Sequence, residues 1–309
     1  MFSRETDPGR GRSGRARPQL ESLEDRCCPS GVTFHSHLLA LTGDSTNGTM
    51  IVRDDGRGDV QVTLDGHRSS YSGVQQILIN SKTGDDTINY ALTGKLTESE
   101  QLTLNLGSAG DLARLDYSKG VSAPGLKVNI NGDGGDQNVT ALFGPVTNTN
   151  LQVDANLGDG FDHFTALFNG DVTGRADVNV RVNGGRGIEG VVVQDHGAIA
   201  ATAQVNVGLN LGSNNNTSHV DYTGKLSGKL AINVQGGPQW DWLESTINLT
   251  PGSTGSLYDH ELGGAGSDLL ILMIHDPGSH LKSLDALING QAGFNTAVHT
   301  PNVRVLNAR

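Results

Sequence analysis

Glycine-rich turns that end in an acidic residue are the part of this chain best suited to chemistry. The fullest copy reads GGAGSD over residues 263–268, and shorter copies occur at several other points of the chain. Glycine lets backbone carbonyls point into a turn, and a carboxylate adds negative charge. Stacked turns could together supply the six to eight oxygens that calcium prefers. The candidate metal ligands are the acids that end these turns: Asp136, Asp162, Glu189, Asp241 and Asp268.

The turn over residues 263–270, GGAGSDLL, fully matches GGxGxDxU and resembles the haemolysin-type (RTX) calcium-binding nonapeptide. The turns that end at Asp136 and Asp162 match its glycine and aspartate core, and Glu189 replaces the aspartate in another copy. The resemblance implies calcium between stacked turns, first of all between residues 132–136 and 158–162. The family has such turns on both sides of each coil, whereas this chain has one per coil. The alternative is that these residues only shape a corner.

The acidic turns recur at a nearly constant spacing. Successive marks are 25 to 27 residues apart. The eight marks are Asp86, Asp111, Asp136, Asp162, Glu189, Asn216, Asp241 and Asp268. Ten residues after the first six marks, the chain always has Leu, Val or Ile, as in Val146, Val172 and Ile199. Such regularity indicates a repeat architecture.

Each repeat contains two runs in which apolar and polar residues alternate, which is the pattern of a strand with one buried face. One repeat has about six inward side chains, each contributing roughly 2 kcal/mol, against an ordering cost of about 1.5 kcal/mol per residue. A single repeat therefore cannot fold alone, but stacked repeats share one core. We predict an all-β, single-domain parallel β-solenoid of about eight coils of 25–27 residues, with capped ends. The alternative is a sandwich of antiparallel hairpins.

The predicted coils occupy the middle of the chain. Residues 81–276 form the solenoid repeats, and residues 32–80 form an N-terminal β cap with a hairpin around Asp55-Gly56. Residues 277–309 form a C-terminal cap, in which Leu281, Leu284, Leu287 and Ile288 fall at helical spacing and predict a short helix. The caps would cover strand edges that otherwise invite aggregation.

Residues 1–31 differ from the rest because they are rich in Arg and Gly and poor in apolar residues, which is typical of a disordered leader. The segment RPQLESLEDRCCPSG, Arg17 to Gly31, resembles the LExLEDRxxPS leader of planctomycete surface and exported proteins. That resemblance implies export to an extracellular or cell-surface location. The alternative is a flexible basic tail. Cys27 and Cys28 are adjacent, a spacing that disfavours a disulfide between them.

Composition limits the partners. The formal net charge is −11, which disfavours nucleic acid and anionic membrane surfaces and is compatible with cations. The sequence has no run of 18 apolar residues, so we expect no membrane span. The expected partners are cell-surface or matrix components or polysaccharide.

Superposing the predicted coils brings no catalytic cluster together. Asp195 is the exception, because it falls at an inward position; a one-residue slip of its strand or a buried acid beside Tyr222 would each explain it. Trp240 and Trp242 could stack on sugar rings or pack against a loop. We therefore predict a non-enzymatic, exported or cell-surface structural or adhesive module, with calcium as its candidate cofactor. The alternative is a carbohydrate-active β-helix, either a polysaccharide lyase or hydrolase or a glycan-binding module.

Overall fold

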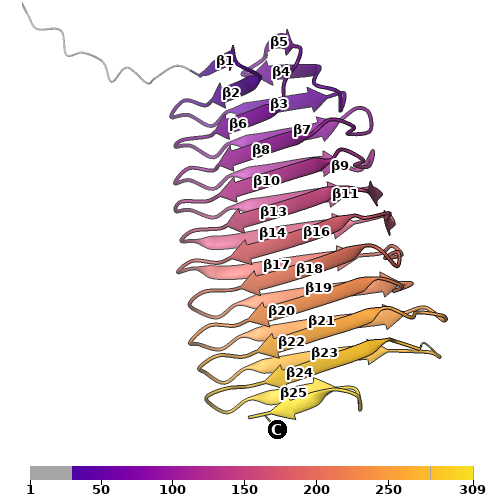
Figure 1. Ribbon diagram of the computed structural model, residues 1–309. Coiled ribbons are helices and arrows are strands. Elements are labelled where there is room, and N and C mark those ends of the chain that lie inside the picture. The colour runs from indigo at the N-terminus through magenta and orange to yellow at the C-terminus, as the bar shows by residue number, and fades with distance from the viewer. Residues whose placement is uncertain (1–29, 279, 309) are drawn as a thin grey trace, which may run out of the picture.

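The computed structural model describes residues 30–278 and 280–308, and these form strands and turns without a helix. The strands lie in two facing sheets, and the chain passes from one sheet to the other as it advances along the stack, from the N-terminal strands at the top of Figure 1 to the C-terminus at the bottom. The predicted parallel β-solenoid is confirmed. Apart from its last two residues, the predicted leader, with Cys27 and Cys28, lies outside the described residues. No helix long and apolar enough to span a membrane occurs in the described part of the chain.

Each large sheet has 12 strands. The first sheet contains, in spatial order, β1 (Gly31–His35), β2 (Leu38–Thr42), β6 (Gln76–Asn80), β8 (Glu100–Asn105), β10 (Gly125–Asn131), β13 (Asn150–Asn156), β16 (Asp177–Asn183), β18 (Gln204–Asn210), β20 (Lys229–Gln235), β22 (Ser256–Leu262), β24 (Ser283–Asn289) and β26 (Arg304–Leu306).

The second sheet faces the first. It contains, in the same direction along the stack, β5 (His67–Tyr71), β4 (Val60–Leu64), β3 (Thr49–Asp54), β7 (Thr87–Leu92), β9 (Leu112–Tyr117), β11 (Asn138–Phe143), β14 (Phe161–Phe168), β17 (Ile188–Asp195), β19 (Thr217–Gly224), β21 (Trp242–Leu249), β23 (Leu269–His275) and β25 (Thr296–His299). Neighbours within each sheet come from successive coils and pair in parallel from β2 and β3 onward, which rules out the hairpin sandwich.

The corner that follows each strand of the second sheet repeats in register. Val146 in β12 (Val146–Thr147) pairs with Val172 in β15 (Val172–Thr173), and Val172 bridges Ile199. The same column extends through isolated bridges to Leu96 at one end and Leu226 at the other. All of these side chains are buried. The single file of apolar corner residues predicted from the spacing is therefore confirmed.

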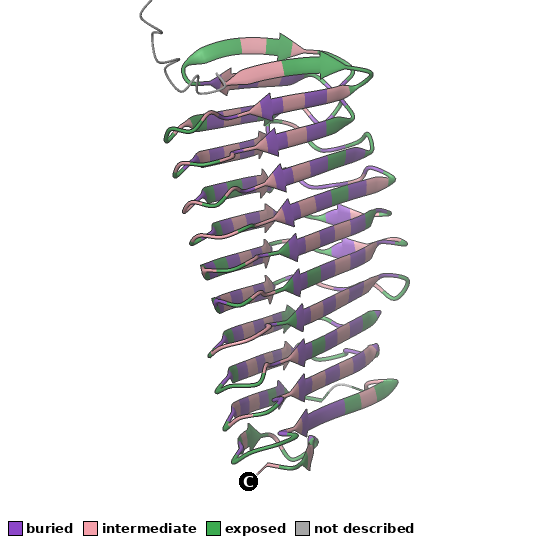
Figure 2. Cartoon of the chain, turned by 90° about the vertical axis from the view of Figure 1, so that its left-hand side faces the viewer, coloured by how far each residue is buried: buried purple, intermediate pink, exposed green. Residues whose placement is uncertain are grey.

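The core lies between the two sheets. Along the strands, buried residues alternate with partly or fully exposed ones (Figure 2). Part of the core is an aromatic stack that runs through Tyr90, Tyr117, Phe143 and Phe168, with ring centroids 4.7–5.4 Å apart. Because equivalent residues of successive coils lie on top of one another, each coil buries the apolar surface of the next.

The two ends are built differently. At the N-terminal end β1 pairs antiparallel with β2, and β3, β4 and β5 form an antiparallel meander, so the predicted hairpin around Asp55-Gly56 is confirmed. At the C-terminal end the predicted helix is wrong. Residues 283–289 form β24, which continues the first sheet in parallel with β22. The edge of β22 offers unpaired backbone groups to this segment, and pairing with them satisfies its backbone in the extended form.

Candidate functional site

The turns from the first sheet to the second enclose a continuous column of polar side chains. We call this the turn column, and its members are Asp86, Asp111, Gln137, Asp162, Glu189, Asn216, Asp241, Asp268 and Asn295. All nine are at most 5% exposed. The acids that the sequence marked as candidate ligands therefore point into the protein, with one exception described below.

Hydrogen bonds connect the column from coil to coil. In most steps a side-chain oxygen accepts the backbone N–H of the column residue one coil earlier, at donor to acceptor distances of 2.8–3.3 Å. Asp86 begins the series by accepting the N–H of Gly48 at 2.6 Å. Charge-assisted bonds of this kind compensate the buried carboxylates and bind adjacent coils together.

Asp136 does not belong to the column. It is exposed, and its carboxylate accepts the N–H of Phe161 at 2.9 Å, while Gln137 occupies the buried position. The residue two positions before a column member often has a positive φ, as in Gly135 (105°) and Gly266 (134°). The chain has glycine at both 134 and 135. The motif GxGxD aligned Gly134 with Asp136, whereas the glycine with a positive φ is Gly135, two residues before Gln137. The predicted mark was therefore wrong by one residue.

The hydrogen bonding of the second carboxylate oxygen differs from one acid of the column to the next. In Asp241 it accepts the N–H of Gly237 at 2.6 Å, so both oxygens have partners. In Asp162, Glu189 and Asp268 one oxygen is buried without a hydrogen-bond partner. Burial raises the pKa of Asp162 and Asp268 to about 6 and that of Glu189 to about 7, and neighbouring acids add to each rise.

Calcium at these turns stays a prediction, and the geometry restricts where it could bind. Asp162 and Glu189 are paired in adjacent coils and each has a free oxygen, whereas Asp241 has none and Asp136 lies outside the column. Within the described residues, no three His, Cys, Asp or Glu side chains converge as a metal cluster. Any turn site would need further oxygens from backbone or water.

Asp195 is a genuine buried acid. Its strand is in register, because Phe168, Asp195 and Tyr222 occupy one column, so the one-residue slip is ruled out. One carboxylate oxygen accepts the N–H of Gly197 at 3.1 Å; the other oxygen and the Tyr222 hydroxyl have no partner. Burial raises the pKa of Asp195 to about 7.

A second interior acid group was missed by the sequence analysis. Glu100, at the start of β8, accepts hydrogen bonds from Tyr90 at 2.9 Å and Tyr117 at 3.0 Å, and Asp54 lies beside it. Burial, and then the Asp54 charge, raise the pKa of Glu100 well above its usual range. One feature of the sequence could have revealed this group. Glu100 falls at an inward position of its strand, which Leu126 occupies in the next coil.

Outside the column, the turns expose an apolar stripe. Its side chains directly precede or follow column members and are 39–87% exposed: Leu112, Phe161, Ile188, Trp240, Trp242 and Phe294. Phe161 and Ile188 are paired in adjacent coils and line a depression of about 350 Å³ with Arg186 and Gln239. Trp240 and Trp242 flank buried Asp241, so both rings face outward. They are 44% and 39% exposed, so more than half of each residue is covered, and both stacking on sugar rings and partial packing against a loop stay predictions.

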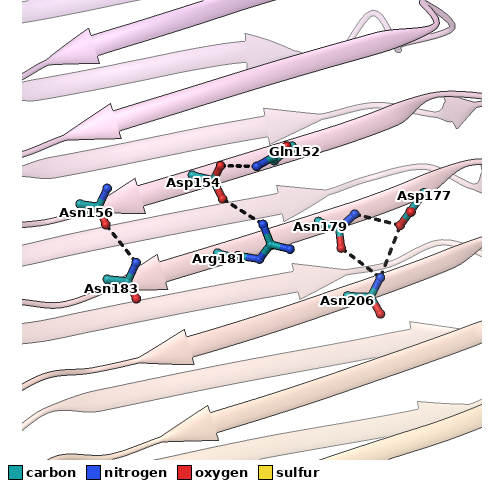
Figure 3. A network of polar contacts seen from close by, with 8 residues as sticks. All are labelled: Gln152, Asp154, Asn156, Asp177, Asn179, Arg181, Asn183 and Asn206. Atoms are coloured by element: carbon teal, nitrogen blue, oxygen red, sulfur yellow. Dashed lines mark hydrogen bonds and ion pairs between the residues drawn. The ribbon is translucent and has the colours of Figure 1, made fainter.

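Before the same turns, the outer face of the first sheet presents an amide ladder. It consists of the last outward residue of successive strands: Asn80, Asn105, Asn131, Asn156, Asn183, Asn210 and Gln235. Neighbouring amides hydrogen-bond along the stack, as Asn183 does to Asn156 at 2.9 Å. Further ladder-like contacts on the same face join Asp154 to Arg181 and Asn206 to Asn179 (Figure 3).

The amide ladder also borders a depression. Asn80, Asn105 and Asn131, with Lys82 and Asp133, line a hollow of about 510 Å³ on the same edge of the stack as the turns. Amide donors and acceptors therefore lie before the turns, and exposed apolar side chains lie within and after them. The chain matches no protein-family model, no curated protein and no solved structure.

Proposed function

We propose that this chain is a non-enzymatic structural and adhesive module of the cell surface or the extracellular matrix, and that its turn edge binds an extended polysaccharide. The observation that supports binding is the exposed apolar stripe, which the same turns connect to the amide ladder. Aromatic rings stack on the apolar faces of sugars, and amides hydrogen-bond to hydroxyl groups. Successive coils lie about 4.8 Å apart, a spacing comparable to one sugar residue in an extended glycan.

The structural part of the proposal is supported by how the chain uses its acids. Asp162 and Asp241 bind backbone N–H groups of neighbouring coils, and Asp195 lies between the sheets. These groups stabilise the stack and have little contact with solvent. Export is supported by the resemblance of residues 17–31 to an export-type leader.

A binding experiment tests the proposal. We expect the wild-type protein to be retarded in affinity electrophoresis through gels that contain a matching polysaccharide, found by screening a glycan array. Replacing both Trp240 and Trp242 by Ala should weaken binding at least about tenfold, because each ring removed costs roughly 1 kcal/mol or more. Met273→Ala is the matched control, because Met273 is 38% exposed on β23 but lies away from the turns.

Three results would contradict this proposal. The first is that the wild-type protein binds no glycan on the array. The second is that Met273→Ala weakens binding as much as the double Trp variant does. The third is depolymerisation of the bound polysaccharide by the wild-type protein, which would favour the carbohydrate-active enzyme instead.

A further inference from the structure

One coil near the C-terminal end has acids at two neighbouring inward positions. Asp259 and Glu261 lie two residues apart on β22, so their side chains point to the same face of the first sheet, and both are 0% exposed. The residues above and below them are apolar. Asp259 pairs with Ile232 in the coil before and with Ala286 in the coil after. Glu261 pairs with Val234 and Ile288 in the same way. The pair is therefore an isolated patch of charge inside an apolar core.

Within the described residues, neither group has a hydrogen bond or an ion pair. All four carboxylate oxygens lack a hydrogen-bond partner, and none of the ion pairs includes Asp259 or Glu261. This differs from the turn column, where each acid accepts at least one backbone N–H or amide contact. Burial raises the pKa of both carboxyl groups well above the usual range.

A third oxygen donor comes from the facing sheet. Ser245, on β21, is 0% exposed and replaces the apolar residues Val220 and Leu272 of its column. It lies close enough to lower the pKa of both carboxyl groups, against the larger rise that burial causes. It nevertheless has no hydrogen-bond partner of its own. A buried hydroxyl without a partner is costly, and its closeness to two acids that also lack partners indicates a shared ligand.

We propose that Asp259, Glu261 and Ser245 form an interior binding site for one hard divalent cation, with calcium as the best match. Two carboxylates balance a charge of +2, which removes the cost of burying them unpaired. The three side chains offer up to five oxygens, and calcium accepts irregular sets of oxygen ligands more readily than magnesium does. Ala286, which pairs with Asp259 in the next coil, has a small side chain.

This site differs from the turn sites that the sequence predicts. It lies between the sheets and not at the corner, and both acids are 0% exposed in the folded state. The cation would bind while the coils stack, because binding is coupled to folding. A chelator should therefore remove it slowly from the native protein and quickly after unfolding.

Metal analysis of the purified protein tests the proposal. After dialysis against a chelator, mass spectrometry should find about one equivalent of divalent cation in the wild-type protein. The double variant Asp259→Asn, Glu261→Gln should lose it. The matched control is Asp162→Asn, Glu189→Gln, which alters two acids of the turn column and should retain the cation. If the control loses the cation and the first variant retains it, the turn prediction is supported and this proposal is overturned.

A second measurement does not depend on the variants folding. Wild-type protein is unfolded in guanidinium with chelator and refolded in metal-free buffer, with or without millimolar calcium. We expect the melting temperature to be higher by at least about 5 °C with calcium, because a ligand that binds only the folded state stabilises it. Metal-free wild-type protein that melts at the same temperature with and without calcium would overturn the proposal, and would assign Asp259 and Glu261 as protonated acids.

Discussion

Buried carboxylates in this protein are compensated to different degrees, and the difference is visible residue by residue. Asp241 accepts two backbone N–H groups, one from its own turn and one from the coil before it. Asp195 accepts one N–H and leaves its other oxygen without a partner. Since a partly compensated buried acid favours its neutral form, the stability of the protein should depend on pH through such groups.

Asp195 gives a prediction about this pH dependence. Burial raises its pKa from 3.8 to about 7, and Asp171 adds slightly to the rise. The folded state therefore binds more protons than the unfolded state between about pH 4 and 7, so the free energy of unfolding falls as pH rises through that window. For Asp195 alone the loss should approach about 4 kcal/mol. Calorimetric melting at intervals from pH 4 to 8 measures it.

In the Asp195→Asn variant the free energy of unfolding should fall less steeply as pH rises, because the titrating group is gone while a polar side chain remains beside Tyr222. Some slope should persist, since Asp162, Glu189 and Asp268 are shifted in the same direction. Glu98→Gln, an exposed acid in another coil, controls for the loss of one negative charge. A wild-type protein that becomes more stable between pH 5 and pH 8 would contradict the prediction.

At the scale of the element, the glycine turn is a corner in which two backbones approach closely. A Cβ on Gly185 would lie 1.6 Å from the carbonyl oxygen of Gly158 in the coil before, and one on Gly263 would meet the Asp268 carboxylate at 2.5 Å. The motif therefore has a purpose that needs no metal. The glycines make room for the neighbouring coil and for the inward carboxylate, which explains why a GGxGxD pattern by itself could not establish calcium binding.

Gly107 tests the importance of close approach between turns. A Cβ there would lie 1.2 Å from the carbonyl oxygen of Lys82. We expect Gly107→Ala to lower the free energy of unfolding by at least about 3 kcal/mol, because the two coils must separate. Gly208→Ala is the control: it is an outward position of β18 with nothing within 4 Å of the added Cβ. This control should be neutral or slightly stabilising. Equal denaturant midpoints for the two variants would refute the role assigned to Gly107.

At the scale of the whole molecule, the repeated features were predicted well, whereas features that occur once, such as the C-terminal strand and the acid pair on β22, were mostly missed. The constant spacing and the column of Val146, Val172 and Ile199 predicted the solenoid, because stacking forces equivalent residues into register. The choice between Asp136 and Gln137 depended on the φ angle of one glycine, which spacing cannot reveal. Asp259 and Glu261 alternate like any inward pair, but only the fold shows that Ser245 faces them.

The same logic predicts that a whole coil can be removed. Deleting residues 189–215 joins Ile188 to Asn216, the next member of the turn column, 27 residues after Glu189. Every column then closes in register, and Phe168 comes to lie beside Tyr222 with Asp195 removed. We expect a folded protein with strand-type circular dichroism and one cooperative transition, with the melting temperature lowered by roughly 10 °C or less, because only one nearest-neighbour interface is lost.

Half a coil should not be removable in this way. Deleting residues 189–201 takes out most of β17 and the corner at Ile199, so a strand of the first sheet would have to follow a turn that leads into the second sheet. Because side chains alternate along a strand and sheets alternate along the chain, the core positions of the later coils would lose their partners. The protein with this deletion should therefore unfold cooperatively at a much lower temperature or fail to fold. If both deletions melt alike, the stability of this protein does not come from coil-on-coil stacking.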